Sequence, residues 1–333
     1  MQDRTEELIE LTKGRSHFSA SLPGLQIAWD STSLGTLKEC PRKYYYTLVE
    51  KWRAKSEALP LTYGIMYHSC LEHYARFKAQ GMNHDEATRA TLRHAYKLTA
   101  VYDGILGAEP GPDKVFTQWQ TTDTRRSKAT LIRSVMWYLD QFGDKDPTQT
   151  VILANGKPAV ELNFKIHLDM VGPDGSPYVF CGHIDRMVIF NEELWVQDHK
   201  TTIGALDSRY FDRYTPDNQM SLYTTAAKVA FEVEAKGCMI DAAQVAVGFT
   251  RFRRGFVHRT PGQLDEFMRD TQYWLKMAEG FAEAQHWPMN DKSCHNYGGC
   301  KFLQVCNKDP KVRAQFITQD FEKQEWNPLI PRE

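Results

Sequence analysis

Apolar positions in the first 145 residues recur every three or four places, the spacing of helices with one buried face. Ser31 or Ser33 can cap a short first helix, and Pro41 suits the first turn of a second. The remaining helical stretches are expected at 62–80, 85–102 and 125–143. We therefore expect an N-terminal arm over residues 1–25 and a mostly helical region over residues 26–145.

Beyond residue 150 the pattern changes to runs of β-branched and aromatic residues separated by turn formers, which is typical of antiparallel strands. The strand-like runs are 151–156, 159–170, 178–190, 194–202 and 242–252. Helical spacing returns at 217–233 and 262–285. This order predicts an α/β core over 146–290, followed by a cysteine-rich element over 291–310 and a polar tail over 311–333.

Composition narrows the class of protein. The 333 residues are 42% hydrophobic and carry a formal charge of −1, which suits a globular protein and excludes one that coats nucleic acid by bulk positive charge. No run is long and apolar enough for a membrane helix, and the acidic start lacks the order of a secretory signal. We expect a cytoplasmic protein with no membrane partner. The glycine-rich motifs of NTPases and dinucleotide enzymes are absent from the sequence.

Two acidic strands flank a turn expected at residues 191–192. With a two-residue loop there, the register places Asp185 directly opposite Asp198, and Lys200 projects from the same strand face as Asp198. Like charges at this spacing favour a cation between them. The hairpin therefore brings two carboxylates and one amine to a single point.

Such a group suits phosphodiester hydrolysis, because a divalent ion held by oxygen ligands offsets phosphate charge and lowers the pKa of an attacking water. Lys200 can position or deprotonate that water, or stabilise the pentacoordinate phosphorus. The alternative is an ordinary ion pair of Asp185 with Arg186 or Lys200 on a solvated sheet face. The apolar run before Asp198 favours the functional interpretation, because buried charge is costly.

The motifs G-H-I-D-R at 182–186 and D-x-K-T-T at 198–202 are followed by Gln219-x-x-x-Tyr223 on the next helix. Together they resemble the RecB-type branch of the PD-(D/E)XK nucleases. The resemblance implies a restriction-endonuclease-like α/β fold, a mixed central sheet flanked by helices, with a helical N-terminal region and a cysteine-ligated C-terminal element. It also implies that Gln219 and Tyr223 border the active site and contact DNA.

The same resemblance assigns roles within the hairpin. It implies that Asp185 and Asp198 ligate Mg²⁺ or Mn²⁺ together with the backbone carbonyl of His199. Lys200 becomes the catalytic lysine.

His68, in the pattern Gly64-x-x-x-His68, is similar to the helical histidine with which this branch supplies a further metal ligand. Glu72, one turn later, shares its helix face and can orient it. Glu161 matches another acidic position of the branch. A regular hairpin places Phe164 opposite Asp185 instead, so we expect Glu161 to need a bulge or an altered turn to come closer.

Cys294, Cys300 and Cys306 form a C-x5-C-x5-C run. Because the branch includes iron–sulfur members with one N-terminal and three C-terminal cysteines, the resemblance implies that Cys40 completes the set around a [4Fe–4S] cluster. The family's commoner spacing has two residues between the first two late cysteines, and four thiolates also suit zinc. The remaining cysteines fall in apolar patterns and are assigned to the core: Cys70, Cys181 and Cys238.

Two basic runs, 125–128 and 251–254, are candidate phosphate contacts, the second interleaved with Phe252 and Phe256. The tyrosines at 44–46 are further candidates for stacking on bases.

The chain resembles stand-alone exonucleases of CRISPR adaptation and phage recombination and the nuclease modules of AddB-type subunits. We therefore expect a metal-dependent DNA nuclease, with single-strand DNA exonuclease as the favoured activity. It would act in recombination, repair or CRISPR or phage DNA processing, in a bacterial, archaeal or phage-infected cell. Recombination or CRISPR adaptation proteins are the expected partners. The alternatives are a catalytically silent nucleic-acid-binding subunit and a zinc-stapled interaction subunit.

Overall fold

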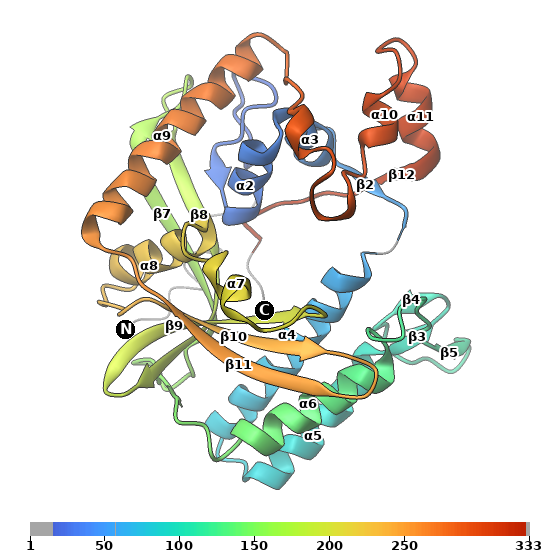
Figure 1. The fold of residues 1–333 in the computed structure, drawn as a ribbon, viewed down its shortest axis with the longest axis vertical. Coiled ribbons are helices and arrows are strands. Elements are labelled where there is room, and N and C mark those ends of the chain that lie inside the picture. Colours follow the sequence, from blue (N-terminus) through green and yellow to red (C-terminus); the bar gives the residue numbers. More distant parts are fainter. Residues whose placement is uncertain (1–15, 57, 331–333) are drawn as a thin grey trace. The chain divides into compact units, whose positions relative to one another are not determined.

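The computed structural model describes residues 16–56 and 58–330, which form two compact units (Figure 1). The first contains Ala58–Leu162 and Ile184–His258, and the second contains Asn163–His183 with the segments 16–56 and 259–330. The units therefore alternate along the chain. Residues 1–15 of the expected N-terminal arm lie outside the described residues.

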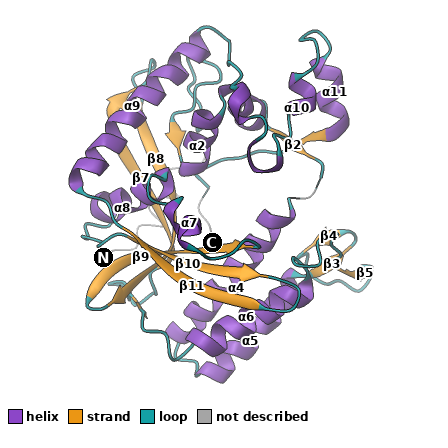
Figure 2. Ribbon diagram, viewed as in Figure 1, coloured by secondary structure: helices purple, strands orange, loops and turns teal. Residues whose placement is uncertain are grey.

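The described chain forms groups of consecutive helices and groups of consecutive strands (Figure 2). The α-helices are α2 (Ser31–Glu39), α3 (Pro41–Tyr44), α4 (Leu59–Ala79), α5 (His84–Leu98), α6 (Lys128–Phe142), α7 (Ser208–Asp212), α8 (Asn218–Ala230), α9 (Pro261–Glu283), α10 (Leu303–Cys306) and α11 (Arg313–Asp320). The strands are β1 (Ala28–Trp29), β2 (Trp52–Ala54), β3 (Ala100–Tyr102), β4 (Ile105–Leu106), β5 (Phe116–Gln118), β6 (Gln149–Thr150), β7 (Val160–Val171), β8 (Pro177–Phe190), β9 (Glu193–Thr202), β10 (Cys238–Val245), β11 (Thr250–Val257) and β12 (Phe321–Lys323).

The main sheet is mixed, with the order β1-β8-β9-β10-β11 and with β6 and β7 also paired to β8. Strand β10 runs parallel to β9, whereas β8 and β11 run antiparallel to their neighbours β9 and β10. This arrangement confirms the predicted α/β fold with a mixed central sheet flanked by helices.

In the first unit, α4, α5 and α6 build a core against one face of the sheet. Leu131 and Val135 of α6 are fully buried in a cluster that also includes Ala243 and Val245 of β10. Helix α6 begins where the sequence supplies a cap, because Ser127 accepts a hydrogen bond from the backbone N–H of Thr130.

Helix α8 covers the opposite face of the same strands. The Sγ atom of Cys238 on β10 lies 3.5 Å from the backbone oxygen of Met220 and 3.6 Å from the hydroxyl of Thr224. Because side chains alternate along a strand, Cys238 faces α8 while Ala243 faces α6. The sheet is therefore buried on both sides at β10.

The hairpin β8–β9 has the predicted two-residue turn. Asn191 and Glu192 have φ values of 50° and 64°, as a type I′ turn requires. The ladder runs from Phe190 opposite Glu193 to Arg186 opposite Gln197. The predicted register is therefore confirmed up to the pair next to the two aspartates.

Two elements differ from the predicted pattern. The run 242–252 was expected to form one strand, but it is split between β10 and β11 by a turn at 246–249, where the backbone N–H of Ala246 donates to Phe249. The helix expected over 85–102 ends at Leu98, and β3 follows because Asp103 and Gly104, with φ of 52° and 80°, turn the chain back into β4.

In the second unit, the N-cap of α2 is Asp30, one residue before the expected serines. Its carboxylate accepts a hydrogen bond from the N–H of Ser33, and the Ser33 hydroxyl accepts one from the N–H of Asp30, which forms a capping box. Helix α9 is held by a 2.8 Å hydrogen bond from the hydroxyl of Tyr178 on β8 to Glu279. The segment expected as a polar tail contains α11 and β12, the latter paired with β2.

None of the helices in the described part of the chain has an apolar stretch long enough to cross a bilayer.

Candidate active site

A chain of contacts joins the end of β9 to the first turn of α8. The ammonium of Lys200 donates to Asp198 Oδ1 at 2.9 Å, lies 2.7 Å from Oδ2, and donates to Gln219 Oε1 at 2.8 Å. The amide of Gln219 then donates to the hydroxyl of Tyr223 at 3.0 Å. Four residues predicted for the site, on two elements, are thus in direct contact.

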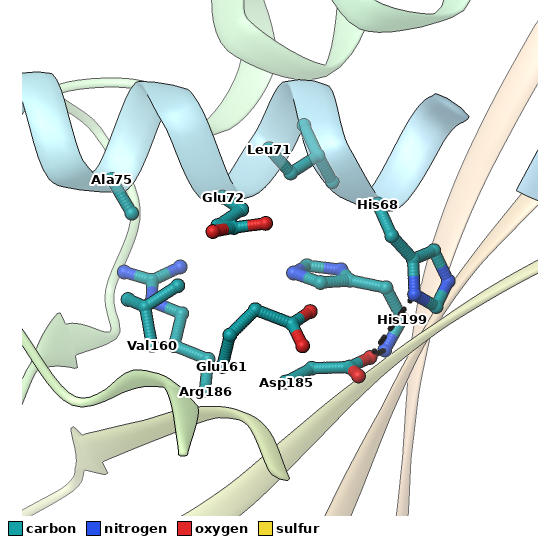
Figure 3. A pocket seen from close by; sticks show the side chains of 9 residues that line it. All are labelled: His68, Leu71, Glu72, Ala75, Val160, Glu161, Asp185, Arg186 and His199. Atoms are coloured by element: carbon teal, nitrogen blue, oxygen red, sulfur yellow. Dashed lines mark hydrogen bonds and ion pairs between the residues drawn. The ribbon is translucent and has the colours of Figure 1, made fainter. Parts of the chain in front are cut away.

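Asp185 lies in a small pocket beside these contacts (Figure 3). Its Oδ2 accepts a 2.9 Å hydrogen bond from the backbone N–H of His199 and lies 3.4 Å from Nδ1 of His68. Helix α4 passes β9 at Gly64, where an added Cβ would lie 3.6 Å from the Thr201 hydroxyl, an ordinary van der Waals contact. The packing at this point therefore does not require a glycine.

The two aspartates are buried and titrate differently. Burial raises the pKa of Asp198 to about 7, Lys200 opposes that rise, and the charge of Asp185 adds to it. Burial also acts to raise the pKa of Asp185, but His68 and Lys200 bring it below the ordinary value. The pKa of Lys200 is raised because Asp198 and Asp185 outweigh the effect of burial. The charges of Asp185, Asp198 and Lys200 therefore interact, as the hairpin register predicted.

Glu161 reaches the same pocket through a local distortion of β7. Its φ of 49° is left-handed, which is unusual for a residue other than glycine and interrupts a regular strand. The N–H of Met187 donates to the Ala159 oxygen at 2.9 Å, so this part of β7 lies beside the Asp185 part of β8. The irregularity that the sequence argument required is thus present at Glu161 itself.

Glu72 lines this pocket with Glu161 and Asp185, and its carboxylate also lies 2.7 Å from the guanidinium of Arg76 (Figure 3). Arg186 lines the pocket too, and its side chain donates to the Thr150 hydroxyl at 2.9 Å. The pocket therefore combines several acids with nearby cations.

Sequence reasoning missed a buried ionic network on the α6 side of the sheet. Arg254 of β11 makes two hydrogen bonds to Asp146, of 2.7 and 2.9 Å, and lies 3.0 Å from Asp241 of β10. The effects of Asp146, Asp241 and Tyr138 together outweigh burial and raise the pKa of Arg254. Paired charges of this kind are costly to separate.

The network reaches the active site through His199. Tyr138 and Gln197 each donate to Asp241 Oδ2 at 2.6 Å, and His199 Nδ1 lies 3.8 Å from the same oxygen. Burial lowers the pKa of His199 to about 4. The backbone N–H that holds Asp185 thus belongs to a residue whose side chain lines the same pocket and lies close to the ionic network.

The donor set suits a hard divalent ion, because buried carboxylate oxygens dominate it. A cation would also offset the burial and the charge of Asp185 that raise the pKa of Asp198. Within residues 16–56 and 58–330, no three His, Cys, Asp or Glu side chains are grouped closely enough to hold a metal ion together. Asp198 is turned toward Lys200, and Asp185 toward His68 and the His199 amide.

The cysteines of the predicted cluster lie in the second unit. Cys40 accepts a 3.4 Å hydrogen bond from the N–H of Asn290, close before Cys294 in the sequence, and Cys300 N–H donates to the Cys294 oxygen at 2.8 Å. Burial and the neighbouring Cys300 and Cys40 thiols raise the pKa of Cys294. Burial, Cys300 and Cys40 also raise the pKa of Cys306, although Arg42 and Arg313 act to lower it. The thiols are neighbours but do not form a ligand group in the described chain.

The three cysteines assigned to the core are all buried: Cys70, Cys181 and Cys238.

The candidate DNA-contacting runs divide into structural and exposed positions. Phe252 packs in the core of the first unit and Arg254 belongs to the buried network, whereas Arg251 and Arg253 are exposed. In the second unit, Tyr44 is fully buried.

The chain is similar to known proteins in family, sequence and structure. The chain matches a family model described as the PD-(D/E)XK nuclease superfamily over residues 29–307. It is 26% identical over 285 residues to the Gene 69 protein of Mycobacterium phage D29, which covers 82% of this chain and 92% of that protein. It is also similar to a crystal structure of a "Putative exonuclease" from Eubacterium rectale, with a TM-score of 0.43, 9% identity, and coverage of 85% of this chain and 94% of that chain.

Proposed function

Because the chain belongs to the PD-(D/E)XK nuclease superfamily, we propose that it hydrolyses phosphodiester bonds of DNA with Mg²⁺ or Mn²⁺. One observation carries this proposal: Lys200 contacts both Asp198 and Gln219, and its charge is coupled to that of Asp185. A half-buried amine beside two buried carboxylates serves no evident packing purpose.

A divalent ion held by Asp185 and Asp198 would offset charge on the scissile phosphate and lower the pKa of the attacking water. The protein's own residues position the carboxylates and the lysine. The His199 amide fixes one oxygen of Asp185, and His68 lies against the same oxygen. Lys200 donates to Asp198 and to Gln219, and from this position it can donate to a phosphate oxygen or to the water.

Exonuclease action on single-stranded DNA is the finer part of the proposal. It is supported by the order and spacing of the Asp185, Asp198-x-Lys200 and Gln219-x-x-x-Tyr223 motifs, which resemble those of stand-alone exonucleases in recombination and CRISPR or phage DNA processing.

The [4Fe–4S] cluster, with zinc as the alternative, is supported only by the order of Cys40, Cys294, Cys300 and Cys306 and by the proximity of these thiols. No step of the proposed reaction depends on it. Iron and zinc analysis of anaerobically purified protein, together with a visible absorption spectrum, tests for this group.

The function is tested by digestion of 5′-labelled DNA in Mn²⁺ and Mg²⁺. Asp198→Asn should abolish digestion, and Asp265→Asn, an exposed position on α9, should leave it unchanged. Linear single strands should be digested faster than duplex, and circular single strands should resist an exonuclease. Equal activity of Asp198→Asn and wild type would contradict the proposal.

A further inference from the structure

Two exposed aromatic rings of the first unit lie beside arginines that carry no acidic partner. Trp137 on α6 is 41% exposed, and Phe249, in the turn between β10 and β11, is 36% exposed. In the described chain, no carboxylate lies within ion-pair distance of Arg133 or Arg251. We call these four residues the aromatic–arginine platform.

Contacts connect the four residues through the turn between β10 and β11. The guanidinium of Arg133 lies 5.4 Å from the ring centre of Trp137 and donates to the backbone oxygen of Phe249 at 3.2 Å. It also donates to the oxygens of Ala246 and Val247. The guanidinium of Arg251 lies 4.7 Å from the ring centre of Phe249. Each ring therefore has a guanidinium beside it.

The fold does not need these rings as core residues. On α6 the next two residues, Tyr138 and Leu139, fill the core, and on β11 Phe252 does so. Trp137 and Phe249 leave large apolar faces in water, flanked by positive charge. Alternating aromatic rings and arginines suit an unpaired nucleic acid strand, whose bases stack on rings while its phosphates meet cations.

The platform lies along the strands that carry the proposed active site. Lys200 of β9 is paired with Ala242 of β10, and the Ala246 N–H donates to Phe249, so Phe249 lies at the level of Ala246. Four residues of strand span about 13 Å at roughly 3.3 Å each. A strand that keeps the stacked B-form rise of about 3.4 Å per nucleotide would cover this distance in about four nucleotides, and a more extended strand would need fewer.

We propose that the aromatic–arginine platform binds unpaired bases of the DNA strand that enters or leaves the active site. This inference deepens the proposed function by naming single-stranded DNA as the ligand of this surface. Trp137 and Phe249 stack on bases, and Arg133 and Arg251 neutralise the adjoining phosphates. Duplex DNA, whose bases are already stacked, makes only the phosphate contacts.

The test is DNA binding by the full chain in EDTA, where cleavage plays no part. Anisotropy of a labelled single-stranded oligonucleotide and of its duplex gives the two dissociation constants for the wild type and for Trp137→Ala/Phe249→Ala. The double variant should bind the single strand about tenfold or more weakly, because each stacked ring contributes severalfold to affinity. Its affinity for duplex should change less than about threefold.

A matched control uses rings of similar exposure elsewhere in the chain. Trp326 is 40% exposed and Phe116 is 51% exposed, so Trp326→Ala/Phe116→Ala should bind both DNA forms as the wild type does. Trp137→Phe keeps a ring and should retain single-strand affinity within about threefold. Arg251→Gln should reduce the salt dependence of single-strand binding.

Unchanged single-strand affinity in the double alanine variant would overturn the proposal and assign the platform to another partner, such as a protein. An equal loss for single strand and duplex would also overturn it, because stacking acts only on unpaired bases. Loss of affinity in Trp137→Phe equal to that in Trp137→Ala would do the same. Absence of DNA cleavage by the wild type would refute the proposed function but not this binding result.

Discussion

The ammonium of Lys200 lies 2.8 Å from Gln219 Oε1, which ties the catalytic end of β9 to the first turn of α8. The two residues are 19 positions apart, and the N-cap of α8 places Gln219, because Asp217 accepts a hydrogen bond from its backbone N–H at 2.7 Å. The helix therefore limits where the lysine ammonium can go.

Gln219→Ala should lower the turnover of DNA by about 10–100-fold, the usual cost of losing a residue that orients a catalytic group. Lys200 would keep its contact with Asp198 but lose its second fixed partner. Steady-state digestion kinetics measure the effect.

Tyr223→Phe should cost less, because it removes only the hydroxyl that accepts from Gln219. Gln272→Ala, an exposed position on α9, is the matched control and should retain wild-type turnover. A Gln219→Ala variant as fast as this control would show that Gln219 does not position Lys200.

Arg254→Met should destabilise the protein by about 3–5 kcal/mol, because it leaves Asp146 and Asp241 buried without their counter-charge. Chemical denaturation of the metal-free protein measures the change in the free energy of unfolding. Arg209→Met removes an exposed arginine paired with Asp207 and should change the free energy of unfolding far less. Equal effects of the two substitutions would mean that the buried network does not stabilise the fold.

The stability of the protein should decline as the pH falls from about 6.5 to about 4. Burial lowers the pKa of His94 to about 4, and the nearby His73 and Lys97 add to this effect. Burial also lowers the pKa values of His17 and His199 to about 4. Between these pH values the unfolded chain binds protons that the folded chain does not. The stability that depends on these neutral histidines is therefore complete above pH 6.5 and is lost on acidification.

His94→Gln should make this decline shallower, as measured by melting temperature across the pH range. His286→Gln, at an exposed position after α9, should leave it as in the wild type. A decline of the same slope in His94→Gln and wild type would show that His94 does not titrate as its burial requires.

The hairpin could be predicted from the sequence because its information is local. The turn at Asn191 and Glu192 sets the register, and the register sets which carboxylates meet. Gln219 and Tyr223 were predicted as a pair because one helical turn separates them, but their contact with Lys200 depends on how α8 packs on the sheet.

The ionic network could not be predicted in the same way. Arg254 belongs to a basic run, and its partner Asp146 lies 108 residues away, so no local pattern joins them. Strand alternation gives a partial signal, because Phe252 and Arg254 share the face that packs toward α6 while Arg251 and Arg253 point away. The turn at 246–249 was missed because its residues are as apolar as the strands beside it.

The most direct test of the account is digestion of 5′-labelled single-stranded DNA in Mn²⁺ by the wild type, Lys200→Ala and the exposed control Lys311→Ala. The account predicts rapid digestion by the wild type and the control, and a rate at least about 100-fold lower for Lys200→Ala. Digestion by Lys200→Ala at the wild-type rate would contradict the assignment of this site to phosphodiester hydrolysis.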